Sequence, residues 1–362
     1  SFISQTDNVK GQFGKLMLFD TRNQRVKEVS PLWGGRVASA RFGRDNRSIF
    51  VTSPDEGNIS IVQISTSFGD TKKIISNGNI RSVTFVDDSL LMIQNNLAHG
   101  DEIYEVGSDG FGFRALTDIQ NKNANESNNV EPFRYAAKTG ESLKGFLIKP
   151  HQNKLGQKHP LIVLARDKGH GLASNRNDSV WEPQFFAKHG FGVVIFDVRG
   201  SIGYGIDFAK ADRDSMGSMS IDDIQAGLEY LKQSEAWIDQ EKLCILTQSE
   251  SGFAANRMLA QQPDMFACSV SLDAPFDTQY FYLQADDMQQ VMTTLGLSSP
   301  TPQSGWAAYS LLDKVVSWRT ASLVTYSADG AFVFESQAKL QQNLLQRAGK
   351  ISSLSAIKLS TS

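Results

Sequence analysis

The sequence predicts an α/β chain in two parts, an all-β segment over residues 1–118 and an α/β domain over residues 131–362. Two observations support this division. Short apolar strands recur about every 40–45 residues in the first part. Strands and helical patterns alternate in the second part, which is typical of a sheet covered by helices. A chain of 362 residues is long enough to give each part its own apolar core.

The all-β segment has the spacing of propeller blades. Strands are predicted at 15–20, 36–42, 48–52, 58–64, 72–75, 80–85, 90–94 and 101–106. Four strands form one blade, so residues 36–78 and 79–118 correspond to whole blades that follow the outer half of another. Because propellers close with about four to eight blades, about two and a half blades make a partial β-propeller; a small open β domain is the alternative. We expect a missing propeller segment or another chain to cover its β edges.

The α/β domain follows a polar stretch over residues 119–130, which is predicted to be a linker. Apolar strands are then predicted at 143–148, 161–165, 193–197, 243–246, 268–272, 322–326 and 353–358, and helices at 181–189, 221–232, 252–262 and 335–348. Near-continuous apolar strands between helices predict a parallel sheet covered on both faces. Asp222 and Asp223 are expected to cap the second of these helices, because carboxylates complement the positive end of the helix dipole.

One strand of this domain leads into a motif with chemical meaning. Residues 242–249 read Lys-Leu-Cys-Ile-Leu-Thr-Gln-Ser, and a helical pattern starts at Gly252. A strand, a tight turn and a helix form the nucleophile elbow of α/β-hydrolases. Ser249 is therefore the candidate nucleophile, and the backbone N–H of Glu250 is a candidate oxyanion donor. The predicted fold is an α/β-hydrolase domain with an N-terminal partial β-propeller.

The histidine that would activate Ser249 is missing from its usual place. In α/β-hydrolases the chain order is Ser, then Asp or Glu, then His, and a serine hydroxyl is a poor nucleophile without a base. All five histidines precede Ser249: His99, His151, His159, His170 and His189. His170 lies in the loop after the strand at 161–165, so it is the candidate replacement base; a solvated loop histidine is the simpler interpretation.

A second motif lies over residues 198–208, Val-Arg-Gly-Ser-Ile-Gly-Tyr-Gly-Ile-Asp-Phe. With Trp181–Val194, Trp237–Leu243 and Asp273–Asp277, it makes residues 130–362 resemble the catalytic domain of the prolyl oligopeptidase family of serine peptidases, and within it the secreted fungal dipeptidyl peptidase V group. The resemblance implies an upstream propeller and a peptide-like ligand. Arg199 and Tyr204 are the substrate-binding candidates, although a structural ion pair is an equal alternative for Arg199.

The catalytic signatures of that family are altered here. The elbow reads Thr247-Gln-Ser-Glu-Ser-Gly252 where the family has Gly-x-Ser-x-Gly-Gly, and β-branched Thr247 is expected to crowd the turn. Arg166-Asp-Lys-Gly169 stands in place of His-Gly-Gly-Pro in the oxyanion loop, where an acidic side chain opposes anion stabilisation. Gly330 falls on the acid position, so Asp329 would be the acid only after a shift of one residue. An ungapped count places Ser362 at or beside the histidine position.

Composition argues against several other function classes. A net charge of −3 and a pI near 6.0 give no electrostatic case for binding nucleic acid or an anionic membrane. No apolar run approaches the roughly 18 residues of a membrane helix, and residues 1–20 lack the layout of a signal peptide. Neither a metal-ligand constellation nor a glycine-rich phosphate loop is present, so we expect no cofactor and no metal.

Two features bear on the compartment. Cys244 and Cys268 fall in predicted core strands and are expected to be buried free thiols rather than a disulfide. Asn-x-Ser sequons occur at four positions, Asn46, Asn58, Asn125 and Asn177. These sequons permit secretion, and with the resemblance they lead us to expect a secreted or extracellular protein; a cytoplasmic one remains an alternative.

Three functional hypotheses follow. We favour a catalytically impaired, dipeptidyl-peptidase-V-like pseudo-peptidase that binds a peptide or protein partner, because the elbow, oxyanion loop, acid and base all depart together. The first alternative is an active serine exopeptidase or esterase whose sequence is clipped at its ends. The second is a structural interaction module in which both domains only pack against partners.

Overall fold

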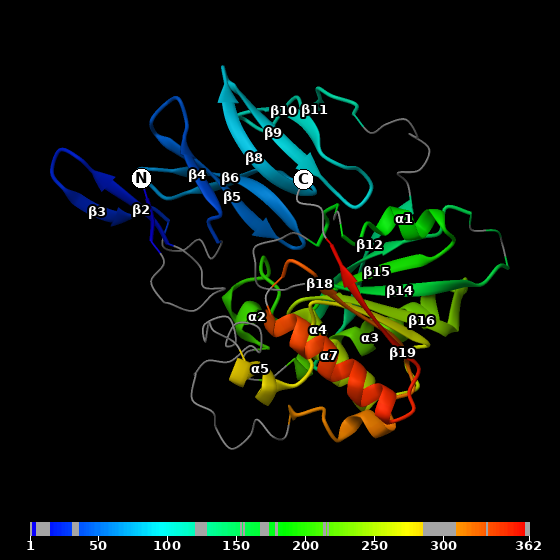
Figure 1. Cartoon of the computed structure of the whole chain (residues 1–362). Helices are drawn as coiled ribbons and strands as arrows, with labels where there is room; N and C mark the ends of the chain where they lie inside the picture. The colour runs from blue at the N-terminus through cyan, green and yellow to red at the C-terminus, as the bar shows by residue number, and fades with distance from the viewer. Residues whose placement is uncertain are drawn as a thin grey trace. The chain divides into compact units, whose positions relative to one another are not determined.

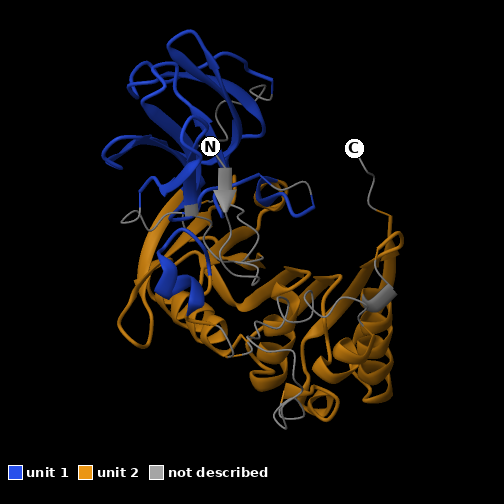
Figure 2. Ribbon diagram, turned by 90° about the vertical axis from the view of Figure 1, so that its left-hand side faces the viewer, with its two compact units in different colours: residues 1–130, 168–184, 201–210 blue, residues 131–167, 185–200, 211–362 orange. Residues whose placement is uncertain are grey.

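The computed structural model describes residues 2–4, 15–30, 36–119, 129–152, 154, 156–166, 174–177, 180–212, 215, 217–284, 309–330 and 332–358. The chain forms two compact units, which Figure 2 colours separately. Unit 1 comprises residues 1–130, 168–184 and 201–210, and unit 2 comprises residues 131–167, 185–200 and 211–362. The expected linker at 119–130 lies largely outside the described residues.

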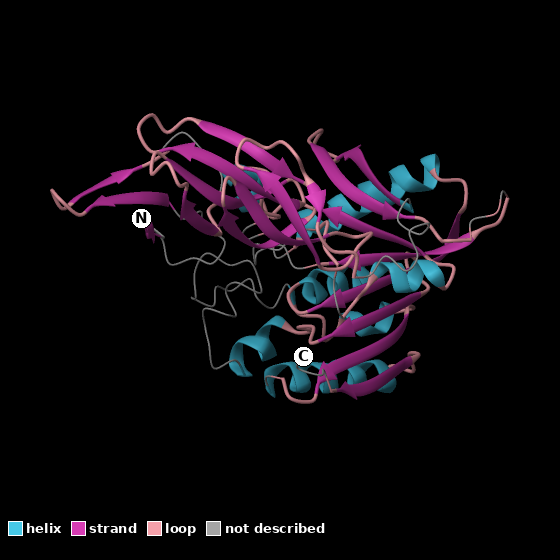
Figure 3. Ribbon diagram, turned by 90° about the horizontal axis from the view of Figure 1, so that it is seen from above, coloured by secondary structure: helices cyan, strands magenta, loops and turns pink. Residues whose placement is uncertain are grey.

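Unit 1 is built from antiparallel sheets (Figures 1 and 3). The first contains β1 (Phe2–Ser4), β2 (Lys15–Asp20) and β3 (Arg25–Glu28). The second has the order β4-β5-β6-β7, with β4 (Ser39–Phe42), β5 (Ser48–Asp55), β6 (Asn58–Ser65) and β7 (Thr71–Ser76). The third has the order β11-β10-β9-β8, with β8 (Asn79–Val86), β9 (Ser89–Asn95), β10 (Glu102–Gly107) and β11 (Arg114–Ala115). The two four-stranded meanders correspond to the segments predicted as blades and have the strand order of a blade.

An apolar core lies between these two four-stranded sheets. Phe50, Ile61 and Ile74 of the second sheet cluster with Leu90 and Met92 of the third. Ile61 and Leu90 are fully buried. Burial of branched and aromatic side chains from alternate strand positions therefore holds the two sheets together.

Two later segments of the sequence, residues 168–184 and 201–210, belong to unit 1. Gly203, with φ +95°, places an ideal Cβ only 3.0 Å from the backbone nitrogens of Asp55 and Glu56. Its carbonyl accepts a hydrogen bond from the Glu56 N–H at 3.1 Å. The Asn175 amide donates to Asn58 Oδ1 at 2.9 Å. The glycine-rich motif at 198–208 therefore gives close backbone contact with the β5–β6 hairpin, which a side chain at position 203 would block.

Unit 2 is organised around an eight-stranded sheet of order β12-β13-β15-β14-β16-β17-β18-β19. Its strands are β12 (Val130–Ala136), β13 (Ser142–Ile148), β14 (His159–Ala165), β15 (Gly192–Asp197), β16 (Ile238–Gln248), β17 (Cys268–Leu272), β18 (Ala321–Ser327) and β19 (Ser352–Ile357). The strands from β15 to β19 are parallel neighbours, as predicted. The prediction is wrong at β13, which runs antiparallel to β15. The described part of the β13–β14 connection contains no crossover helix, so the chain reverses direction there.

Helices pack on this sheet (Figure 1). Those in contact with its strands are α3 (Ser218–Ser234), α4 (Ser251–Gln261) and α7 (Phe332–Arg347). Helix α5 (Thr278–Gln284) packs against α7, and the 3₁₀ helix η4 (Lys314–Ser317) packs against α4 and α7. The remaining described helices are α1 (Pro183–Lys188) and the short α2 (Ile206–Lys210), which belongs to unit 1. Leu228 of α3 and Met258 of α4 are buried with Val163 and Ile245 of the strands. Among the described residues, none of the helices is long and apolar enough to span a membrane.

The cysteine prediction is wrong. Cys244 of β16 and Cys268 of β17 are direct register partners and form a disulfide, with their Cα atoms 4.7 Å apart. Both are half-buried at the start of the parallel pairing between the two strands. The sequence identified both strands, but the disulfide depends on their register, which hydrophobic pattern alone does not specify.

Candidate active site

Ser249 lies at the carboxyl end of β16, on the turn into α4. Its φ is +52°, in the left-handed region that non-glycine residues seldom occupy. Its N–H donates to the carbonyl of Leu272 at 2.9 Å, and its own carbonyl accepts from the Gly252 N–H at 3.0 Å. A residue with positive φ between a strand and a helix has the backbone geometry of a nucleophile elbow.

Gly252 explains how α4 can begin so close to the sheet. An ideal Cβ at this position would lie 2.2 Å from Ala274 Cβ and 3.0 Å from Ala274 Cα. Real Cβ atoms do not approach so closely, so the turn requires glycine here. Thr247 is buried beside Gly252, and its Oγ1 would lie 3.4 Å from a Cβ added at position 252. Thr247 of β16 lies in register with Ala165 of β14 and with Ser271 of β17.

Ser251 links the elbow to β14. Its Oγ lies 2.9 Å from the carbonyl oxygen of Ala165 and 2.8 Å from that of Gln248. It also accepts a hydrogen bond from the Gln248 N–H at 3.2 Å. A glycine, which the family has at this position, could not make these bonds. Ser251 in place of glycine therefore adds polar connections to the turn.

The oxyanion side of the site is only partly described. Glu250 is half-buried at the N-cap of α4, and Arg166 is half-buried after the end of β14. Residues 167–173, which include the candidate base His170, lie outside the described residues. The roles of the Glu250 N–H and of His170 therefore stay predictions.

The predicted acid lies on an open turn. Asp329 is exposed between β18 and α7, and Gly330 next to it donates its N–H to the Ser327 carbonyl at 3.0 Å. Within the described part of this turn, no hydrogen bond or ion pair orients the Asp329 carboxylate as a triad acid is oriented. Its catalytic role stays a prediction.

Sequence reasoning missed another carboxylate at the same edge, Asp273. It follows β17 with φ +50°, and because Gln248 pairs with Leu272, it is the next residue on the strand beside Ser249. Its Oδ1 accepts from the Ser327 N–H at 2.8 Å, and its Oδ2 accepts from Ser327 Oγ at 2.5 Å. Because the carboxyl ends of parallel strands meet at one edge of a sheet, an Asp directly after a predicted strand could have been predicted to lie near Ser249.

Arg199 forms a buried ion pair with Asp223, and its role in substrate binding stays a prediction. Its residue is 7% exposed, and its Nη2 lies 2.6 Å from Asp223 Oδ1. Its Nε is 3.0 Å from both carboxylate oxygens, and its Nη1 donates to Thr139 Oγ1 at 3.0 Å. Hydrogen bonding to Asp223 raises the pKa of Arg199 above its usual value. This bidentate pair fixes the chain after β15 to α3.

The capping role expected for Asp222 and Asp223 is wrong. Helix α3 begins at Ser218, after Gly217 with φ +80°, so both residues lie beyond its first turn. Asp223 is fully buried against Arg199, and Asp222 pairs with Lys138 at 2.8 Å. The apolar pattern in the sequence begins at residue 221, whereas the helix begins at Ser218. The first turn was therefore predicted three residues too late.

Tyr204, the other substrate-binding candidate, is half-buried in unit 1. Its ring centroid lies 4.8 Å from that of Phe208, at 35°. This contact orders the ring within the glycine-rich segment. Binding of substrate by Tyr204 stays a prediction.

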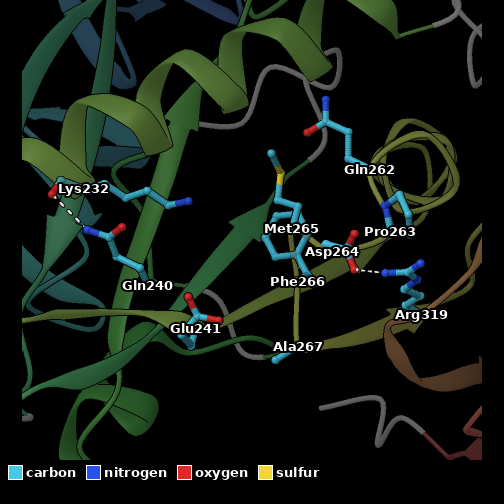
Figure 4. Close-up of a pocket in the computed structure, with 10 residues that line it drawn as sticks. All are labelled: Lys232, Gln240, Glu241, Gln262, Pro263, Asp264, Met265, Phe266, Ala267 and Arg319. Carbon is cyan, nitrogen blue, oxygen red and sulfur yellow. Dashed lines mark hydrogen bonds and ion pairs between the residues drawn. The ribbon is translucent and has the colours of Figure 1, made fainter.

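A pocket of about 550 Å³ lies at the opposite edge of the unit 2 sheet (Figure 4). Its lining comes from the end of α3, the start of β16 and the segments leading into β17 and β18: Lys232, Gln240, Glu241, Gln262, Pro263, Asp264, Met265, Phe266, Ala267 and Arg319. Arg319 pairs with Asp264 at 2.7 Å, and both side chains are exposed. Open α/β sheets bind ligands at the carboxyl ends of their strands, so we do not assign the active site to this pocket. Within the described ranges, no group of three or more His, Cys, Asp or Glu side chains could hold a metal.

Comparison with known proteins agrees with this architecture. Acylaminoacyl peptidase from Pyrococcus horikoshii superposes with a TM-score of 0.84 at 21% identity, covering 99% of this chain and 56% of that one. Dipeptidyl peptidase 4 from Porphyromonas gingivalis superposes with a TM-score of 0.75 at 17% identity, covering 99% of this chain and 50% of that one. The α/β-hydrolase fold predicted from the elbow is thereby confirmed.

Sequence relatives give the family. Dipeptidyl-peptidase 5 of Schizosaccharomyces pombe is 21% identical over 353 residues, which is 95% of this chain and 51% of that protein. Human dipeptidyl peptidase 8 is 32% identical over 155 residues, 42% of this chain and 17% of that protein. The chain thus spans about half the length of the first relative. Residues 176–358 match the prolyl oligopeptidase family, and the chain belongs to that family.

Proposed function

We propose that this chain is a dipeptidyl-peptidase-like protein with impaired catalysis that binds a peptide or protein partner. The observation that carries the proposal is the state of the two carboxylates at the catalytic edge. Asp329 is exposed, and Asp273 has both carboxylate oxygens hydrogen-bonded by Ser327. A triad acid orients the histidine through a hydrogen bond. Among the described residues, neither carboxylate is bonded to a histidine: the bonds of Asp273 come from Ser327, and Asp329 lies on an exposed turn.

The ligand class follows from the relatives. Their names include dipeptidyl-peptidase 5 and acylaminoacyl peptidase, and both names denote action on peptides. The chain spans about half the length of each of these two proteins. That it binds a peptide as they do is therefore proposed. A peptide-like molecule is the class that this fold would continue to bind after losing turnover.

A second candidate function is an active serine exopeptidase or esterase. The positive φ of Ser249 favours it, because a strained backbone at a nucleophile position costs free energy of about 1–3 kcal/mol. In that case the base would come from His170 or from residues outside this sequence. The two candidates differ in one measurable property, the nucleophilicity of Ser249.

We also propose a secreted or extracellular location. The Cys244–Cys268 disulfide supports it, because disulfides persist mainly in oxidising compartments. A free-thiol assay on protein taken from its natural source tests this point. Two reactive thiols per denatured chain would contradict an oxidising location.

The functional test combines a fluorophosphonate serine probe with peptide binding. We expect labelling of the folded chain at about 1% or less of that of an active family peptidase, because loss of a triad group lowers turnover about 10⁴–10⁶-fold. The Ser249→Ala variant is the matched control for labelling at this serine. We expect saturable binding of the unreactive peptide Z-Gly-Gly-Phe, whose chloromethyl ketone is bound in a solved acylaminoacyl peptidase.

The outcomes separate the hypotheses. Stoichiometric labelling that disappears in Ser249→Ala would overturn catalytic impairment and support the second candidate. Absence of both labelling and peptide binding would contradict the binding role. Binding without labelling is the expected result.

A further inference from the structure

Two complete glycosylation sequons lie in the same four-stranded sheet of unit 1. Asn46-Arg-Ser48 occupies the turn between β4 and β5, and Asn58-Ile-Ser60 opens β6. The sequence alone treats them equally, because each is Asn-x-Ser without proline. Their surroundings differ in ways that bear directly on whether the amide nitrogen can carry a sugar.

Asn46 is exposed, with φ +53° on the hairpin turn. The turn is held by its neighbours: Asp45 Oδ1 accepts from the Arg47 N–H at 2.9 Å and from the Ser48 N–H at 3.0 Å. Ser48 Oγ donates to the same oxygen at 2.9 Å. Among the described residues, no hydrogen bond involves the Asn46 side-chain amide; only its backbone N–H bonds, to Gly43. A substituent on that amide therefore displaces no contact of the turn.

Asn58 is half-buried, and both the nitrogen and the oxygen of its side-chain amide form hydrogen bonds. Its Nδ2 lies 3.4 Å from the carbonyl oxygens of Asp55 and Glu56. Its Oδ1 accepts from the Gly78 N–H at 3.0 Å and from Asn175 Nδ2 at 2.9 Å. A sugar on Nδ2 would enter the β5–β6 turn, against which Gly203 also packs. Glycosylation here is incompatible with the folded unit.

We infer that Asn46 is an N-glycosylation site and that Asn58 remains unmodified in the folded protein. In the reaction, Asn46 Nδ2 forms a bond to the anomeric carbon of a lipid-linked oligosaccharide diphosphate. The bond from that carbon to the diphosphate oxygen breaks, the lipid diphosphate leaves, and the amide loses one proton. The inference rests on the proposed secreted location, because the sugar donor is found in the secretory pathway.

A glycan at this position would also protect a sheet edge. β4 is an edge strand of its sheet, and Phe42 at its end is 38% exposed. Exposed strand edges pair readily with other chains, and bulky or charged groups beside them prevent this. The Asn46 glycan would project from the turn that directly follows this strand.

The test is secretion of the full chain from yeast behind a cleavable leader, followed by glycopeptide mass mapping before and after glycosidase treatment. Wild type is compared with Asn46→Asp and Asn58→Asp, because aspartate keeps the side-chain shape and tolerates the turn. We expect a glycan on the Asn46 peptide in wild type and in Asn58→Asp, and its loss in Asn46→Asp. Secreted, folded wild-type protein with Asn46 bare, or with a glycan at Asn58, would overturn the inference.

A parallel measurement on protein from its natural source separates the two proposals. A glycan at Asn46 in the leader-directed protein but not in the natural one would contradict the location while the acceptor site stands. A bare Asn46 in both would overturn the site itself. Circular dichroism of each secreted variant confirms that it is folded.

Discussion

The turn after β16 and the turn after β18 lie at the same edge of the sheet, but they are stabilised differently. The first is fixed by packing and polar bonds, through Gly252 against Ala274 and Ser251 against the Ala165 carbonyl. The second presents Asp329 to solvent. The groups that maintain the elbow are therefore separate from those that would orient a histidine. A chain can retain the strained Ser249 backbone through packing alone. The geometry of the elbow is therefore evidence for the fold, whereas evidence for catalysis has to come from the acid and the base.

The largest expected effect concerns the disulfide between β16, which leads to the elbow, and β17. The Cys244–Cys268 bridge closes a segment with a sequence separation of 24 and joins the strands that lead to Ser249 and Asp273. Replacing both cysteines with Ala should lower the free energy of unfolding by about 3.5 kcal/mol, since the open chain gains conformational entropy. Denaturant midpoints without reductant measure it. A double variant as stable as wild type would show that the bridge contributes nothing to this edge.

A smaller effect is expected at the elbow itself. Gly252→Ala brings a Cβ to 2.2 Å from Ala274 Cβ, so the unfolding free energy should fall by about 1–3 kcal/mol through overpacking. The matched variant Gly252→Ala with Ala274→Gly removes the closest contact and should recover part of the loss. Thermal and denaturant unfolding of the three proteins give the comparison. Equal stability of all three would mean that packing does not fix the turn.

The sequence predicted local features well and pairings poorly. Residues 268–272 were predicted as a strand and form β17 with those bounds, because a short apolar run before a turn specifies its own length. The elbow was predicted from a strand, turn and helix that are contiguous in sequence. The disulfide and the Arg199–Asp223 pair were not, because both join residues about 24 positions apart whose meeting depends on strand register and helix placement.

Asp273 and Asp329 show the same limit within the candidate site. Counting along the chain put Gly330 on the acid position and left Asp329 one residue early, on an exposed turn. The carboxylate beside the elbow strand comes from the end of β17, and its position became apparent only from the Gln248–Leu272 register. Counting along one segment cannot show what a neighbouring strand contributes to a shared edge.

The smallest expected effects come from a matched pair of substitutions at these two carboxylates. Asp273→Asn weakens two hydrogen bonds from Ser327 and should lower the unfolding free energy by about 1 kcal/mol. Asp329→Asn changes an exposed group and should stay within about 0.5 kcal/mol. Denaturant unfolding ranks the two, and fluorophosphonate labelling of the same variants reports on chemistry. If Asp329→Asn reduced labelling of Ser249 while Asp273→Asn left it unchanged, the exposed turn would hold a working acid, and the contrast between the two turns would fail.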